Sequence, residues 1–182
     1  MNFFQKLATL KFMALVSGVY LFFVLYLMRL PFLRVKNIDL ESLDIRWSYT
    51  LGDVTTLFNT LGIEGLEQYK KFLIIDAFYP LVYGLLLILG IIYLQQKIGH
   101  LGKWIQWMRW LPIVLVLLDY TENINTWLMI NSFPYVKDSA VCFGSTITMF
   151  KWYLAYICVG LMMCGFLVVI LRNTLWKWRN QK

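Results

Sequence analysis

The segment WLPIVLVLLDYTENINTWLMI, residues 110–130, decides the fold class of this chain. It is long enough to cross a bilayer as a helix, which takes about 20 mostly apolar residues. Its middle nevertheless carries Asp119, Glu122 and Asn123. Charged and polar groups at membrane depth are costly, and they normally face a helix bundle or a wet cavity. The segment therefore predicts a membrane-spanning helix with one polar, inward-facing side.

Three further apolar runs of similar length lie at residues 10–30, 72–94 and 148–171. The composition agrees with membrane insertion, since 60% of the 182 residues are hydrophobic, only 15% are charged and the mean hydropathy is +0.63. No repeat or linker-like stretch divides the sequence. We therefore predict an all-α fold, with residues 1–182 forming a single integral membrane domain built as a four-helix bundle.

Basic residues predict the orientation of this bundle, because Lys and Arg near the ends of spans stay in the cytoplasm. They gather at the N-terminus, in the loop between the second and third spans, and in the tail: Lys6, Lys11, Lys97, Lys103, Arg109, Arg172, Lys177, Arg179 and Lys182. The other two loops balance basic with acidic residues. We therefore expect cytoplasmic N- and C-termini. The net charge of +7 is then mainly a topology signal, and it calls for no nucleic acid.

The first external loop, residues 31–71, contains an amphipathic segment. In SYTLGDVTTLFNTLG (residues 48–62), Thr50 and Asp53 have the spacing of a capping box, and Gly62 is a C-terminal stop signal. The apolar face is formed by Val54, Leu57, Phe58 and Leu61. The pattern predicts a short helix at the outer membrane surface. This helix either packs against the end of the bundle or covers a cavity as a lid.

The loop between the third and fourth spans is NSFPYVKDSAVCFGST, residues 131–146. Pro134 and Gly144 are typical turn residues, so we predict a short external turn here. Cys142 lies in the same loop. We interpret it as an unpaired external thiol that serves as a small loop residue. The sequence has no C-x-x-C motif, which argues against a quinone-linked thiol oxidase.

Polar side chains recur at helical spacing on three of the predicted spans, so that they share a face on each. These stripes are Asp76, Tyr79 and Tyr83; Asp119, Glu122, Asn123 and Thr126; and Thr148 and Lys151. The four charged residues among them, Asp76, Asp119, Glu122 and Lys151, fall in the outer half or the centre of the bilayer in the predicted topology. We therefore predict one shared site, with Glu122, Asp119 and Asp76 as candidate catalytic acids and the remaining residues of the stripes as candidate ligand-binding groups.

Three acids against one lysine leave an excess of negative charge, and close carboxylates in a low dielectric do not all ionise. The site can therefore hold a proton, act as an acid/base pair or bind a cation. Structural alternatives are that Lys151 snorkels to the interface, that Asp76 caps the start of the second span, and that Asn123 only joins helices. The pair of Glu122 and Asp119 is the hardest to explain in this way, because packing seldom needs two ionisable groups one turn apart.

Several familiar patterns are missing from the sequence. His100 is the single histidine and falls in a predicted cytoplasmic loop, so we expect no His-rich metal site. Gly-rich phosphate loops and the G-x-S-x-G motif do not occur either. We expect neither a metal nor a cofactor.

The blocks GLEQYKKFLIIDAFYPLVYGLLL (residues 65–87) and LLDYTENI (residues 117–124) follow a long amphipathic loop. This layout resembles the EXPERA group, which includes the emopamil-binding sterol isomerase and the sigma-2 receptor. The resemblance implies an intramembrane cavity for a lipophilic, often amine-bearing ligand, with Asp76, Asp119 and Glu122 as candidate acids. The cavity histidine of the sterol isomerase has no counterpart here, which argues against that reaction. The same blocks also resemble small uncharacterised bacterial membrane proteins.

From these features we expect a multi-pass membrane protein whose outer-half polar site binds a lipophilic or cationic small molecule or a lipid. Acid/base chemistry on that molecule is compatible with the carboxylates. Alternatives are a proton- or cation-coupled small transporter, for which a homo-oligomer is compatible, and an accessory subunit whose polar residues only fix helix packing. The membrane would be the inner or plasma membrane of a bacterium, or an ER-type membrane of a eukaryote.

Overall fold

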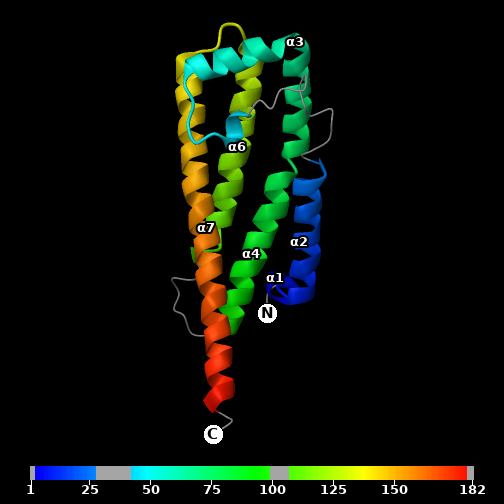
Figure 1. The fold of residues 1–182 in the computed structure, drawn as a ribbon, viewed down its shortest axis with the longest axis vertical. Coiled ribbons are helices and arrows are strands. Elements are labelled where there is room, and N and C mark those ends of the chain that lie inside the picture. Colours follow the sequence, from blue (N-terminus) through cyan, green and yellow to red (C-terminus); the bar gives the residue numbers. More distant parts are fainter. Residues whose placement is uncertain (1–2, 28–41, 99–106, 180–182) are drawn as a thin grey trace.

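The structure, a computed structural model, describes residues 3–27, 42–98 and 107–179 of the chain (Figure 1). The described elements are α1 (Phe3–Leu7), α2 (Leu10–Leu25), the 3-10 helix η3 (Leu43–Ile45), α3 (Leu51–Asp76), α4 (Tyr79–Ile98), α6 (Trp110–Ser132) and α7 (Asp138–Arg179). The prediction of an all-α fold is therefore confirmed for these residues. Residues 28–30 of the first predicted span, residues 31–41 of the first loop and His100 lie outside the described residues.

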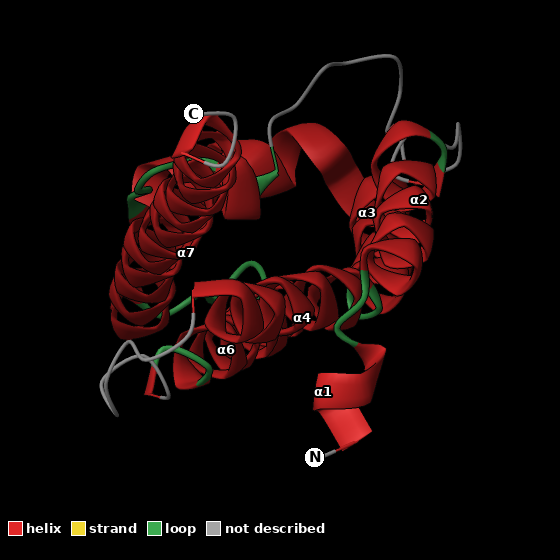
Figure 2. Cartoon of the chain, turned by 90° about the horizontal axis from the view of Figure 1, so that it is seen from below, coloured by secondary structure: helices red, strands yellow, loops and turns green. Residues whose placement is uncertain are grey.

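The long helices lie side by side (Figure 1). Helices α6 and α7 form an antiparallel hairpin, whose turn lies at one end of the molecule beside the first part of α3. Seen along the bundle, α4 and α6 lie between α2 and α7 (Figure 2). Helix α4 packs against α2, α6 and α7, whereas α2 packs chiefly against α4. Helix α1 and the last turns of α7 lie toward the other end of the molecule, away from the α6–α7 turn.

Two helical stretches among the described residues are long and apolar enough to cross a membrane, judged by length and composition: Leu51–Ile98, which comprises α3 and α4, and Asp138–Arg172 within α7. In the most apolar part of the α7 stretch, only 6% of the residues are buried inside the protein. Large apolar side chains such as Ile157 and Leu167 are therefore exposed along α7. An apolar surface of this extent is unusual for a monomeric protein in water.

The predicted capping box opens α3. The backbone N–H of Thr50 donates to Asp53 Oδ2 at 2.8 Å, and the Asp53 N–H donates to Thr50 Oγ1 at 3.3 Å. The Thr50 hydroxyl also donates to Asp53 Oδ2 at 2.7 Å, and this bond, followed by the one from the Thr50 backbone N–H, lowers the pKa of the Asp53 carboxyl. The predicted apolar face is also confirmed, because Val54, Leu57, Phe58 and Leu61 are all buried in one cluster with residues of α6 and α7.

Gly62, the predicted stop, is where α3 bends. Its φ of +63° lies in the left-handed region, which glycine adopts without a Cβ penalty. Before this residue α3 lies across the end of the bundle, and after it α3 runs along the other helices (Figure 1). We call residues 51–61 the crossing arm of α3.

The second predicted span, residues 72–94, is divided between two helices instead of forming one. Helix α3 ends at Asp76, and α4 begins at Tyr79. Pro80 explains the interruption, because proline has no N–H to donate to the preceding turn and disfavours helical backbone at the residue before it. Tyr120 Oη donates to the carbonyl of Ala77 at 2.8 Å, so that a side chain of α6 binds the backbone at the break.

The turn between α6 and α7 is shorter than predicted, because α7 already begins at Asp138. The prediction that Gly144 is a turn residue is wrong, since it lies inside α7. A Cβ at this position would lie 2.4 Å from Tyr49 Oη and 2.4 Å from Asn125 Nδ2. Glycine at this position therefore permits close packing of neighbouring side chains instead of a turn.

Candidate functional site

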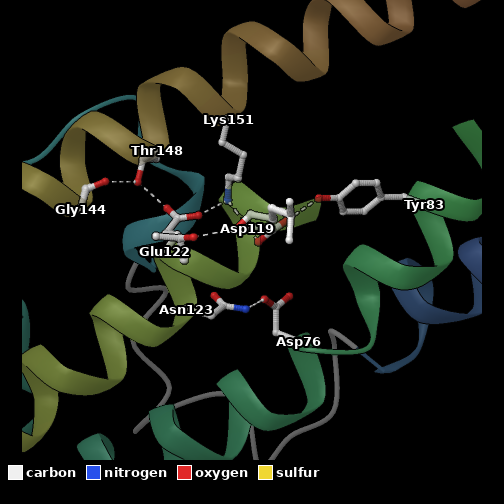
Figure 3. A network of polar contacts seen from close by, with 10 residues as sticks. Asp76, Tyr83, Asp119, Glu122, Asn123, Gly144, Thr148 and Lys151 are labelled. Carbon is white, nitrogen blue, oxygen red and sulfur yellow. Dashed lines mark hydrogen bonds and ion pairs between the residues drawn. The ribbon is translucent and has the colours of Figure 1, made fainter. Parts of the chain in front are cut away.

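Buried and part-buried polar side chains from four helices gather at one place in the bundle (Figure 3). Asp76 comes from the end of α3, Tyr83 from α4, Asp119, Glu122 and Asn123 from α6, and Thr148 and Lys151 from α7. Glu122 and Thr148 are 0% exposed, and Lys151 is only 8% exposed. The structure thus brings together most of the residues that the stripes in the sequence predicted as a shared site.

Lys151 is the positive centre of a network of contacts among them. Its Nζ forms an ion pair with Glu122 and lies 3.7 Å from Asp119 Oδ1. Thr148 Oγ1 donates to Glu122 and lies 3.0 Å from the Gly144 carbonyl oxygen. The lysine side chain points into the bundle toward α6 (Figure 3), so the alternative that it snorkels to the interface is wrong.

Tyr83 extends the network to α4, because its Oη donates to Asp119 Oδ2 at 2.6 Å. A continuous chain of contacts thus runs from Tyr83 through Asp119, Lys151 and Glu122 to Thr148. In a site shielded from water such contacts are strong, and a polar group left without its partner there lowers the stability of the fold. The chain joins three helices and contains two carboxylates that can hold or pass a proton.

Asp76 has a different kind of partner. Its Oδ2 accepts a hydrogen bond from Asn123 Nδ2 at 2.7 Å. Within the described part of the chain, no lysine or arginine forms an ion pair with this carboxylate. Asp76 is the last residue of α3 and lies shortly before the start of α4, and the hydrogen bond described for its carboxylate comes from Asn123 of α6. That it caps the second span stays an alternative.

Asn123 has an unused acceptor. Its side chain is 7% exposed, and its Oδ1 atom is buried without a hydrogen-bond partner among the residues described. Figure 3 shows the amide group beside the Asp76 carboxylate, with Asp119 and Glu122 on the side toward α7. Leaving a buried polar atom unsatisfied costs about 1–3 kcal/mol. The site therefore offers acceptor oxygens in excess of the donors that the described residues supply.

Two of the predicted ligand-binding residues, Tyr79 and Thr126, take no part in the contacts described above. Tyr79 Oη donates to Tyr20 Oη at 3.1 Å, and the two rings stack with centroids 5.7 Å apart, so Tyr79 connects α4 to α2. Thr126 is 2% exposed and lies one turn beyond Glu122 on the same face of α6. Tyr79 therefore has a clear packing role.

A strap, residues 42–50, brings a second set of groups to this site. It includes η3 and lies beneath the crossing arm of α3 (Figure 1). The Leu43 N–H donates to Tyr69 Oη at 3.0 Å, and the Tyr49 N–H donates to Ser145 Oγ at 2.9 Å. The strap is therefore attached to α3 near one end and to α7 near the other.

Two residues of the strap, Asp44 and Tyr49, act on the network, although the sequence pattern did not indicate either. Asp44 acts on Asp76, Asp119 and Glu122 electrostatically, as a like charge. The Tyr49 hydroxyl lies beside Thr148, and burial raises its pKa to about 12. No spacing rule relates a residue of an irregular loop to a distant helix. Tyr49 does precede the capping box, where an apolar residue often packs inward as a hydrophobic staple.

The described residues contain no group of three or more His, Cys, Asp or Glu side chains arranged to hold a metal ion. What the arrangement offers is buried negative charge, one compensating lysine and unpaired acceptor atoms. Comparisons of the chain with family models, with curated proteins and with solved structures give no match. The resemblance to the EXPERA group stays a prediction.

Proposed function

We propose that this chain is a multi-pass membrane protein whose buried polar site binds the positively charged head group of a lipophilic molecule. The observation that carries the proposal is the imbalance of charge. Lys151 of the network is engaged by Glu122 and Asp119, whereas the partner of Asp76 among the described residues is the Asn123 amide. A protonated amine would donate hydrogen bonds to Asp76 and to the unpaired Oδ1 of Asn123, and its apolar tail would extend into the surrounding lipid.

The four spans of this proposal are α2, α4, α6 and α7, with both termini in the cytoplasm. The exposed apolar surface of α7 supports it, because hydrocarbon is the natural neighbour of such a surface. The depth of the site along α6 also agrees with a location inside the membrane. Glu122 lies about 15 Å along α6 from the end of the helix at Ser132, at 1.5 Å per residue. That is about half of a hydrocarbon core of roughly 30 Å.

Cysteine labelling tests this topology. Cys142 is exposed near the start of α7 and should react with a membrane-impermeant maleimide in intact cells. Lys97→Cys, at the exposed end of α4, should react only after permeabilisation. Cys142→Ser controls for reaction at other thiols. If the labelling pattern is reversed, the site lies in the inner half of the membrane, and the assignment from basic residues is wrong.

Binding of a simple amphiphile tests the proposed function. We expect dodecylammonium to bind the purified protein in nanodiscs, and dodecanol to bind far more weakly, because only the amine carries a positive charge. Asp76→Asn should weaken amine binding about 10–100-fold, since a hydrogen bond to a charged group contributes about 1.5–3 kcal/mol. Calorimetric titration against empty nanodiscs measures both effects.

Glu64→Gln is a suitable control. Glu64 is exposed on α3, so this substitution should leave amine binding unchanged. Equal binding of dodecylammonium and dodecanol would contradict a cation site. If neither molecule binds, the polar residues serve helix packing, as expected for the accessory-subunit alternative.

A further inference from the structure

We infer that the hydrocarbon of the membrane ends level with the polar site, and that the site takes its ammonium group from a lipid of the outer leaflet. This placement rests on the proposed function, in which α2, α4, α6 and α7 span the membrane and the site binds a cation. It adds the position of the membrane along the bundle and the class of molecule that supplies the amine.

Helix α7 shows how much of the bundle suits hydrocarbon. Between Lys151 and Arg172, residues 152–171 contain no Asp, Glu, Lys or Arg. Their large apolar side chains are exposed, with Ile157 at 51% and Leu167 at 58%. At 1.5 Å per residue this stretch is about 30 Å long, which equals the thickness of a hydrocarbon core. The whole helix has 42 residues and is about twice as long, so a large part of it lies outside the hydrocarbon.

The two ends of this stretch carry the side chains expected at a membrane surface. At the inner end, Arg172 Nη1 donates to the carbonyl oxygens of Ile98 at 2.9 Å and of Lys97 at 3.2 Å, which places it beside the end of α4. At the outer end, the ring of Trp47 lies 4.9 Å from that of Tyr153, and both rings are exposed. Tryptophan and tyrosine are enriched where a membrane meets water. The outer surface of the hydrocarbon therefore lies near Tyr153.

The break between α3 and α4 gives the same level from another part of the bundle. Asp76, at the end of α3, contacts Asn123 of α6. The neighbouring Glu122 pairs with Lys151 of α7, which precedes Tyr153 by two residues. The break is therefore level with the outer end of the charge-free stretch of α7.

The exterior of α3 and α4 changes its character at this break. Before the break, α3 exposes three charged side chains, which are Glu64, Glu67 and Lys71. After the break, residues 77–96 contain no charged residue. Exposed charges avoid hydrocarbon, so the hydrocarbon begins at the break. We call this level, set by the break and by Tyr153, the hydrocarbon boundary.

The hydrocarbon boundary lies well inside the outer end of the bundle. Gly62 precedes Asp76 by 14 residues of α3, which is about 21 Å at 1.5 Å per residue. The crossing arm begins beyond Gly62 and thus lies in water, past a head-group layer that is roughly 5–8 Å thick. Its exposed side agrees with this position, because it carries Asp53, Thr56 and Asn59. Ser132 at the end of α6 likewise lies outside the hydrocarbon.

A site at the hydrocarbon boundary is level with lipid head groups. Its acceptors, on Asp76 and on the unpaired Oδ1 of Asn123, match an ammonium group that has N–H donors. A lipid with a primary ammonium head group has this group at the right level, while its acyl chains lie along the exposed apolar surface below. Secondary transporters bind their substrates near the middle of the bilayer. The level of the site therefore favours recognition of a lipid over the transport alternative.

Two leucines of α6 test the hydrocarbon boundary. Leu117 and Leu128 are both 59% exposed and lie on opposite sides of the polar site. Each is replaced by cysteine in a background without Cys142, Cys158 and Cys164, and is labelled with bimane in nanodiscs. A nitroxide in the middle of the lipid acyl chains should quench the label of Leu117→Cys about fivefold more than that of Leu128→Cys, because only residue 117 lies in hydrocarbon. Iodide in the water should quench the two labels in the reverse order.

Two isoleucines repeat this comparison on other helices. Ile157 of α7 lies below the hydrocarbon boundary and Ile63 of α3 lies above it, and both are exposed. If the nitroxide lipid quenches Leu128→Cys and Ile63→Cys as strongly as Leu117→Cys and Ile157→Cys, the hydrocarbon extends to the outer end of the bundle and the inferred level is wrong. Equal quenching by iodide at all four positions would show that the bundle is not inserted at this level.

Competition by a lipid tests the source of the amine. We expect phosphatidylethanolamine in the nanodisc to weaken dodecylammonium binding about tenfold relative to phosphatidylcholine alone. Its ammonium group competes for the same acceptors, whereas the choline group has no N–H to donate. The residual binding of Asp76→Asn should not respond to the lipid, and Glu64→Gln, at an exposed position of α3, should respond like the wild type.

The outcomes separate the two proposals. If the wild-type protein does not bind dodecylammonium in phosphatidylcholine nanodiscs, the proposed function is wrong, whatever level the quenching gives. If it binds dodecylammonium equally well in both lipids, the cation site stands and lipids of the leaflet do not supply its ligand.

Discussion

Replacing Lys151 with methionine is expected to lower the free energy of unfolding by about 3–5 kcal/mol. The change removes the cation that forms ion pairs with both Glu122 and Asp119, and it leaves two buried carboxylates without a positive partner. Methionine retains most of the volume of the lysine chain, so the cost arises from charge and not from a cavity. Chemical unfolding in mixed micelles, followed by loss of helical signal, measures the effect.

Neutralising the partners should reverse this loss. We expect Lys151→Met combined with Glu122→Gln and Asp119→Asn to recover most of the stability, because no uncompensated charge then remains. Lys71→Met, at an exposed position of α3, should change stability by less than about 0.5 kcal/mol. If Lys151→Met unfolds like the wild type, the lysine does not compensate the two carboxylates.

Truncating Phe58 to alanine should have an effect of similar size. Phe58 is 0% exposed in the crossing arm of α3, and its ring lies edge-on to Phe133 with centroids 5.7 Å apart. Removing a buried phenylalanine side chain costs about 3–5 kcal/mol, through lost apolar burial and the cavity left behind. We expect an unfolding transition lowered by this amount and faster hydrogen exchange across the crossing arm.

Ile63→Ala is the matched control, because Ile63 is 86% exposed just after the bend and its truncation should have little effect. Equal stability of the two variants would show that the arm is not held by its apolar face. Phe58→Ala also separates the two roles predicted for the crossing arm, which are packing against the bundle and covering a cavity as a lid. If Phe58→Ala loosens the arm without changing the exchange of bound dodecylammonium, the arm packs against the bundle and is no lid.

Regular patterns account for what the sequence could predict. Helical spacing placed Asp119, Glu122 and Asn123 on one face of a helix, and the structure confirms that this face is buried. The capping box of Thr50 and Asp53 could also be predicted, since both residues lie within one helical turn. Such local rules depend on geometry that every helix shares.

Long-range packing decided the features that the sequence did not indicate. Asp44 lies in the single turn of η3, where no periodicity relates it to Asp76. Gly144 looks like a turn residue in sequence, and only the nearby Tyr49 hydroxyl and Asn125 amide explain why a larger residue would not fit. The break before α4 was recoverable from Pro80, but the apolar run that contains it favoured a single helix.

The arrangement in which α2 packs chiefly against α4 has a consequence for how the protein can vary. Apart from Tyr20, whose ring stacks on Tyr79, α2 lies away from the polar network. The hairpin of α6 and α7, with α3 and α4, forms a unit that carries Asp76, Asp119, Glu122 and Lys151. Mutations in α2 therefore affect assembly more than chemistry, so its sequence can drift under weaker selection. Engineers could likewise supply α2 as a separate peptide, and its reassociation would report on the bundle without touching the site.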